Sequence, residues 1–172
     1  MLKKILIGLA IVLGLLVVGG LALPDDYQVS RSANLAVHPD SLQPYLDDLL
    51  LWKTWAPWEK MDTTIVTTMG SITRGVGASQ SWTDKSGGGR LEILVSQPGR
   101  VEYDVWFSQS PKPAHSLMLA EPVEGGTRLT WSMEGEMDMP VVGPYLSMMA
   151  DRMIGPMFQQ GLDDLKELVE TP

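Results

Sequence analysis

The residue types that most often carry enzymatic or metal chemistry are scarce in this chain. His38 and His115 are the only imidazoles among 172 residues, and there is no cysteine. Zinc usually needs three or four positioned ligands, and neither histidine has a partner at helical spacing. We therefore predict no metal site and no cofactor, and we assign both histidines to the surface or to a capping loop. His115 shares strand parity with Leu117 and Leu119, so a polar group in a cavity wall is the alternative.

Nucleophile and phosphate-loop motifs are not recognisable either. Ser79 and Ser81 have no histidine and aspartate partners at the spacing of a hydrolase triad. The glycine-rich segments 74–77 and 87–89 lack the Lys-Ser/Thr pair and the following helix of a P-loop, so we interpret each as a bulge or hairpin turn. We predict no catalytic residue. For an enzyme that needs a buried polar pair, the candidates are Tyr103, His115 and Glu134.

Methionine and tryptophan are the residues whose clustering indicates a binding function. Seven of the 11 methionines lie between 133 and 157, and Met149, Met153 and Met157 recur every four residues. This spacing places them on one helix face, where flexible thioethers suit an adaptable apolar pocket, with an ordinary core stripe as the alternative. Trp82 and Trp131 fall on inward strand positions.

The first 24 residues predict a membrane anchor. Lys3 and Lys4 precede an apolar run, residues 5–23, which spans roughly 28 Å as a helix and matches the hydrocarbon thickness of a bilayer. The positive-inside rule keeps the N-terminus cytoplasmic, so a single-pass protein would carry its domain, residues 25–172, outside the cytoplasm. In a Gram-negative bacterium that location is the periplasm. A cleaved signal peptide, with small residues at 20–22, is the alternative.

The net charge argues against one class of partner. Lys and Arg total 13 against 21 Asp and Glu, which gives a net charge of −8 without a basic run. Phosphate backbones are bound by clustered Lys and Arg, so we predict that the protein binds no nucleic acid.

Hydrophobic periodicity predicts an α+β fold. After a first strand at 26–37, helical spacing indicates two short helical pieces that end before Pro57. From residue 63 the period becomes two and turn residues separate the strands, which is typical of antiparallel neighbours. The predicted strands are 63–69, 76–83, 89–97, 100–109, 114–122 and 126–135. A long helix over about 144–169 closes the order, with Pro156 inside it.

Alternation assigns the residues of these strands to two faces. Leu91, Ile93 and Val95 share one face, and Glu92 and Ser96 lie on the other. Tyr103 lies inward with its neighbours at 101, 105 and 107, and Trp106 points outward. One face of the sheet is therefore expected to contact water.

Several segments resemble the polyketide cyclase/dehydrase branch, also called SRPBCC, of the START-like or helix-grip superfamily. They are Trp52–Trp58, Gly75–Ser79 with Trp82, Gly126–Trp131, and the ending Gly155–Lys166. The resemblance covers nearly all of 27–170 and identifies the chain as a membrane-anchored member. It implies a curved antiparallel sheet of about seven strands wrapped on the long C-terminal helix. Between them it implies a cavity for an apolar or amphipathic molecule.

Three functions remain open at this point. The leading hypothesis is a non-enzymatic domain that binds an apolar small molecule or lipid on the outer face of a membrane. The expected cavity-lining residues are Trp82, Tyr103, Trp131, Met149, Met153 and Met157. A cyclase or dehydrase of a polyketide-like substrate is the second hypothesis. An interaction module with a filled core is the third, and large side chains at every inward position would distinguish it.

Overall fold

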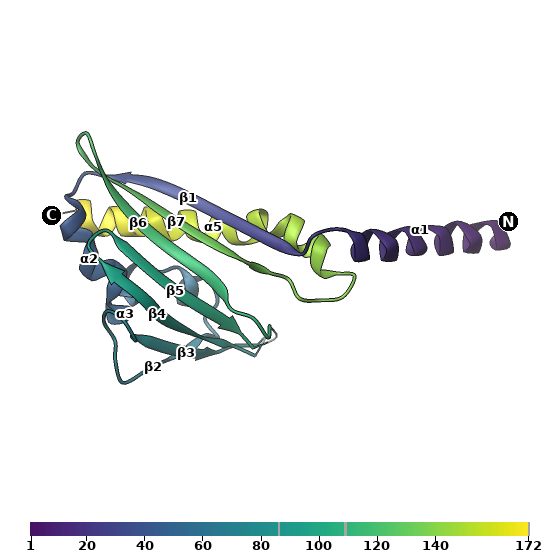
Figure 1. Cartoon of the computed structure of the whole chain (residues 1–172), viewed down its shortest axis with the longest axis horizontal. Coiled ribbons are helices and arrows are strands. Elements are labelled where there is room, and N and C mark those ends of the chain that lie inside the picture. The colour runs from purple at the N-terminus through teal and green to yellow at the C-terminus, as the bar shows by residue number, and fades with distance from the viewer. Residues whose placement is uncertain (86, 109, 172) are drawn as a thin grey trace.

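A computed structural model describes residues 1–85, 87–108 and 110–171, and it has the predicted α+β helix-grip architecture (Figure 1). The element order is one apolar helix, one strand, three short helices, six strands and one long helix. The helices are α1 (Leu2–Ala22), α2 (Pro39–Asp47), α3 (Leu49–Trp55), α4 (Trp58–Met61) and α5 (Gly143–Glu170). The strands are β1 (Asp26–Leu35), β2 (Val66–Met69), β3 (Ser79–Thr83), β4 (Gly89–Gln97), β5 (Arg100–Phe107), β6 (Ala114–Val123) and β7 (Gly126–Glu136).

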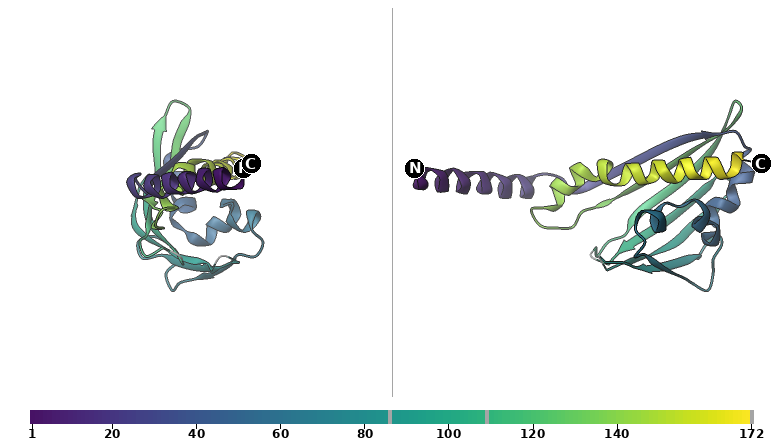
Figure 2. Two further views of the ribbon diagram at one scale, coloured as in Figure 1. Left: turned by 90° about the vertical axis from the view of Figure 1, so that its right-hand side faces the viewer. Right: turned by 180° about the vertical axis from the view of Figure 1, so that it is seen from behind.

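The seven strands form one antiparallel sheet in the order β1-β7-β6-β5-β4-β3-β2. Tight turns connect most of the sequential neighbours, and left-handed glycines occupy several of them; Gly99, with φ 75°, turns β4 into β5. The first strand pairs with the last, which brings β1 and β7 beside α5. The sheet curves around α5 and the short helices, as the end-on view shows (Figure 2, left).

Small side chains determine how α5 packs on the sheet. Ser147, Ala150, Gly155 and Gly161 are buried along the stripe of the helix that faces β1 and β7. A Cβ at Gly161 would lie 2.8 Å from the ring of Trp131, so glycine is required for this close approach. The helix therefore approaches the sheet through small residues, and its larger apolar residues at 158, 162 and 165 complete the core.

The short helices after β1 begin and end where local chemistry predicts. The His38 side chain caps α2 by accepting a hydrogen bond from the Asp40 amide, at 3.4 Å, so one histidine does occupy a capping position. The α3 helix ends at Trp55, before Ala56-Pro57. A single further turn, α4, follows Pro57 and makes three short helices where two were predicted.

A β-bulge corrects the predicted faces of one strand. The register of β4 against β5 shifts between Ile93 and Val95, so that Ser96 pairs with Val101 and points inward. Val95 pairs with Glu102 on the outer face, contrary to the strict alternation predicted from the sequence. The Ser96 hydroxyl donates a hydrogen bond to the buried carboxylate of Asp47 at 3.0 Å, which explains a polar residue at an inward position.

The apolar helix α1 projects from one end of the domain (Figure 1). It is long and apolar enough to cross a membrane, by length and composition, and nearly all of its side chains are exposed. Its last turns contact the domain: the Tyr145 hydroxyl donates a hydrogen bond to the Leu16 carbonyl at 2.8 Å. Gly20 lies so close to the backbone of Val141 that a Cβ would overlap the Val141 carbonyl.

Candidate functional site

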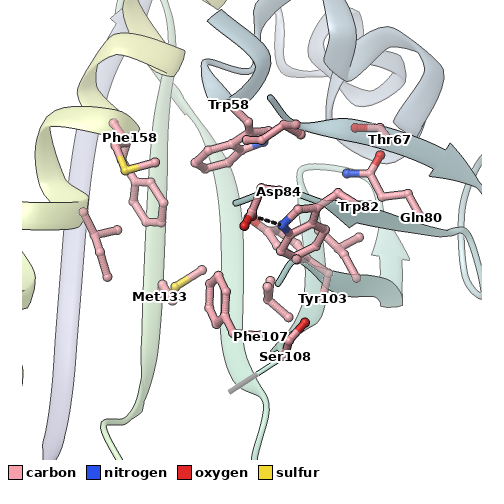
Figure 3. A pocket seen from close by; sticks show the side chains of 16 residues that line it. Trp58, Thr67, Gln80, Trp82, Asp84, Tyr103, Phe107, Ser108, Met133 and Phe158 are labelled. Atoms are coloured by element: carbon pink, nitrogen blue, oxygen red, sulfur yellow. Dashed lines mark hydrogen bonds between the residues drawn. The ribbon is translucent and has the colours of Figure 1, made fainter. Parts of the chain in front are cut away.

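A cavity of about 440 Å³ lies between the sheet, α4 and α5 (Figure 3). Strands β2 to β5 supply most of its floor, β7 supplies one residue, and α4 and α5 cover it. The lining residues are Trp58, Ile65, Thr67, Gln80, Trp82, Asp84, Gly88, Leu91, Tyr103, Val105, Phe107, Ser108, Met133, Ile154, Met157 and Phe158. Most are apolar or aromatic, so the space suits a molecule with a large apolar surface.

Strand alternation positions the floor of the cavity. Tyr103, Val105 and Phe107 follow one another on the inner face of β5, and Leu91 pairs with Val105 on β4. Trp82 contacts Phe107 edge-on across the sheet, with ring centroids 6.0 Å apart. The floor is therefore a continuous apolar surface that reaches from the core to the exposed end of β5.

An aromatic cluster closes the cavity toward the core. Phe158 of α5 stacks on Trp131 of β7, with ring centroids 4.2 Å apart and planes 3° from parallel. The indole N–H of Trp131 donates a hydrogen bond to the Tyr103 hydroxyl at 2.8 Å. Burial raises the pKa of Tyr103 well above its usual range, so this phenol stays protonated at physiological pH. The phenol is a poor general base, and it can serve as a hydrogen-bonding group.

Polar groups gather near the ends of β3 and β5. The Trp82 indole N–H donates to the Asp84 carboxylate at 3.2 Å, and Ser108 lies nearby at the end of β5 (Figure 3). Phe107 is 43% exposed and Ser108 is exposed, so the cavity reaches the surface here. We call Asp84, Phe107 and Ser108 the mouth of the cavity. An apolar interior with polar groups at the mouth matches the two halves of an amphipathic molecule.

The structure brings three of the six expected lining residues to the cavity. Trp82, Tyr103 and Met157 line it. Trp131 lies one layer behind, buried under Phe158, and does not line the cavity. Met149 and Met153 lie elsewhere: their side chains are 50% and 53% exposed.

The prediction that Met149 and Met153 line the cavity was therefore wrong. The buried stripe of α5 runs through the small residues at 147, 150 and 155, and helical periodicity rotates Met149 and Met153 to the opposite side. The four-residue repeat of methionines indicates an apolar face, but the small residues at 147, 150 and 155 form the face that packs closely on the sheet.

Other lining residues were overlooked although the sequence contained a signal for some of them. Val105 and Phe107 share the strand parity of Tyr103, and Leu91 shares that of Ile93, so alternation alone would have added three residues. Trp58 contributes to both the aromatic cluster and the cavity. Ile65 and Asp84 lie just outside strands, where periodicity gives no guidance.

The remaining candidates for chemistry lie outside the cavity. His115 sits on the outer face of the sheet between two carboxylates, with Nδ1 2.9 Å from Asp104 and Nε2 3.3 Å from Glu102. Glu134 is exposed and pairs with His115 across β6 and β7. Of the three acid–base candidates only Tyr103 lines the cavity. Within the described residues, no group of His, Cys, Asp and Glu side chains has an arrangement that could hold a metal ion.

Comparisons with known proteins agree with this architecture. A family model described as "Polyketide cyclase / dehydrase and lipid transport" matches residues 26–170. Protein CV1439 from Chromobacterium violaceum is 19% identical with a TM-score of 0.62, and the match covers 84% of this chain and 98% of that one. Protein MLL2253 from Mesorhizobium loti is 16% identical with a TM-score of 0.57, covering 81% and 97%.

The solution structure of the KanY protein gives a TM-score of 0.64 at 12% identity, covering 84% of this chain and 98% of that chain. These identities support the fold alone. No curated protein matches the sequence.

Proposed function

The chain belongs to the polyketide cyclase / dehydrase and lipid transport family, and from this premise we propose that its cavity binds an apolar or amphipathic small molecule or lipid. The observation that carries the proposal is the 440 Å³ space between α5 and the sheet. Its volume falls in the range of roughly 300–1,000 Å³ typical of small-molecule sites.

The character of the lining supports binding of an apolar group. Aromatic and aliphatic side chains from β4, β5 and α5 surround the interior, and burial there removes ligand surface from water. The polar side chains at the mouth would orient the polar end of an amphipathic ligand toward solvent. A filled interaction module would need large side chains closing every inward position, and the cavity counts against that alternative.

We also propose that α1 anchors the domain to a membrane. A helix of this length and hydropathy, with Lys3 and Lys4 at its start, suits a single-pass segment with a cytoplasmic N-terminus. Full-length protein would then sediment with membranes and resist carbonate extraction. A mature N-terminus near Leu23 would instead identify a cleaved signal peptide.

Native mass spectrometry of gently purified full-length protein tests the binding proposal. We expect a copurified lipid or small molecule, and saturable binding of an apolar fluorophore by the emptied protein. Ile154→Trp should reduce both, because Ile154 lines the cavity and the larger side chain would occupy it. Leu168→Trp on the same helix, outside the cavity lining, is the matched control. A wild type that carries nothing and binds no probe would contradict the proposal.

A further inference from the structure

Exposed apolar side chains gather where α5 begins, beside the end of α1. They are Met139, Val142, Met148, Met149 and Met153, each between 42% and 73% exposed. We call this set the juxtamembrane surface. Soluble proteins rarely leave so many large apolar residues exposed in one region without a partner.

The position of α1 identifies that partner. The Leu16 carbonyl, which accepts the Tyr145 hydrogen bond, lies six residues before the end of α1, or about 9 Å along the helix axis. If the apolar run is inserted as far as Leu23, the start of α5 must lie at the level of the bilayer interface. Tyrosine is enriched at that level, because its ring is apolar and its hydroxyl is polar.

The junction between α1 and the domain is fixed rather than free. Only three residues separate α1 from β1, and the Asp25 carbonyl accepts a hydrogen bond from the Met137 amide at 2.9 Å. The Ser147 hydroxyl donates to the same carbonyl. Val141, next to Gly20, has a φ of 67°, a strained value for a β-branched residue, which the surrounding contacts must hold. The domain therefore has a defined orientation relative to α1.

From this geometry we propose that the juxtamembrane surface inserts into the interfacial region of the bilayer that holds α1. The inference rests on the proposal that α1 is a membrane anchor. Interfacial elements typically bury their apolar side chains about 5–10 Å into the headgroup and acyl boundary. Arg152, exposed between the methionines of α5, can extend its guanidinium toward the headgroups. Insertion of apolar side chains holds this surface at the bilayer, so the contact does not require anionic lipid and forms on zwitterionic lipid.

The same orientation turns the mouth of the cavity toward the bilayer. Antiparallel register places the end of β3, both ends of the β5–β6 connection and the start of β1 at one end of the sheet (Figure 1). The pairs that establish this are Trp82 with Gly89, Gly89 with Phe107, Val105 with Ala114, His115 with Glu134, and Glu136 with Asp26. A membrane lipid would then enter the cavity directly from the outer leaflet.

Site-specific labels in the full-length protein test the docking. The chain has no cysteine, so Met149→Cys and Met153→Cys each give one attachment point for an environment-sensitive fluorophore. Leu168→Cys is the matched control, since Leu168 is a 38% exposed apolar residue at the other end of α5. The proteins are reconstituted in phosphatidylcholine vesicles with or without nitroxide-headgroup lipid, and iodide probes exposure to water.

We expect the emission of labels at 149 and 153 to shift to the blue, to be quenched by nitroxide lipid and to be protected from iodide. The label at 168 should show no blue shift and no nitroxide quenching, and iodide should quench its emission. Equal iodide quenching at all three positions, in carbonate-resistant protein, overturns the docking and leaves the anchor standing. A blue shift without nitroxide quenching that grows with protein density indicates a second copy and also overturns it. Protein released by carbonate contradicts anchor and docking together. Apolar-fluorophore binding, measured separately, reports on the cavity.

Discussion

Replacing Tyr103 by phenylalanine removes one hydroxyl from the most buried part of the site. The change leaves the ring in place, so no cavity forms in the core. It also leaves the indole N–H of Trp131 without the acceptor that lies 2.8 Å away. A buried donor that loses its partner costs about 1–3 kcal/mol, and the free energy of unfolding should fall by that amount.

Urea denaturation of the full-length protein in a mild detergent measures this loss. With an m value of roughly 1–3 kcal/mol per molar, a loss of about 2 kcal/mol lowers the midpoint by about 1 M. Tyr45→Phe is the control, because Tyr45 is only half-buried and its hydroxyl makes no side-chain hydrogen bond within the described residues. Equal midpoints for Tyr103→Phe and the wild type would refute the role assigned to this hydrogen bond.

The pH dependence of stability gives an independent check. Burial raises the pKa of Tyr103 in the folded state, whereas the unfolded state titrates near 10.0. Below pH 10 the Tyr103 hydroxyl keeps its proton in both the folded and the unfolded state, so its ionisation does not lower the free energy of unfolding. Above it the unfolded state loses its proton first, so the free energy of unfolding falls by up to about 1.4 kcal/mol per pH unit. Tyr103→Phe should reduce this decrease in the free energy of unfolding. Part of the decrease should remain, because burial also raises the pKa of Tyr27.

Four further substitutions test the packing of α5, the cavity and the buried carboxylate. Met153→Ala should lower the free energy of unfolding by less than the roughly 2–5 kcal/mol of a packed methionine, because Met153 is half-exposed; Met157→Ala, at the cavity, should instead change apolar-fluorophore affinity. Gly161→Ala should destabilise the fold despite the higher helix propensity of alanine, since its Cβ would lie 2.8 Å from Trp131; an unchanged thermal midpoint would show that the helix can shift. Asp47→Asn should cost about 1–3 kcal/mol in urea denaturation, because Arg74 and Ser96 lose a charged partner, and exposed Asp40→Asn in the first turn of α2 should cost less than about 1 kcal/mol.

The order of elements could be predicted because local signals agreed along the chain. Period-two alternation from residue 63, turn glycines and the breaks at Pro57 and Pro98 together specify an antiparallel sheet with short connections. The predicted strand ends that fall on described residues differ from the observed ones by at most three residues; the predicted end at residue 109 lies outside the described residues. The resemblance implied a curved sheet of about seven strands, but the pairing of β1 with β7 was not predicted, because local patterns do not specify it.

The details of the site depend on tertiary contacts that periodicity does not encode. The bulge after Ile93 reverses the faces of Val95 and Ser96 and brings Ser96 to the buried Asp47, which is distant in sequence. The methionines at 149 and 153 form a regular apolar repeat, yet close packing of α5 through small residues turned that repeat outward. An amphipathic pattern identifies an apolar face without identifying what covers it.

The aromatic cluster beside the cavity also makes the protein its own optical reporter. The ring centroids of Trp55 and Trp58 lie 5.4 Å and 5.5 Å from that of Trp131, and the centroids of Trp52 and Trp55 lie 5.7 Å apart. Excitation energy can therefore pass readily among these indoles. Trp58 belongs both to this cluster and to the cavity lining. A molecule entering the cavity would change the surroundings of one emitter that is coupled to the others. Intrinsic emission and near-ultraviolet circular dichroism would then follow occupancy without any added dye.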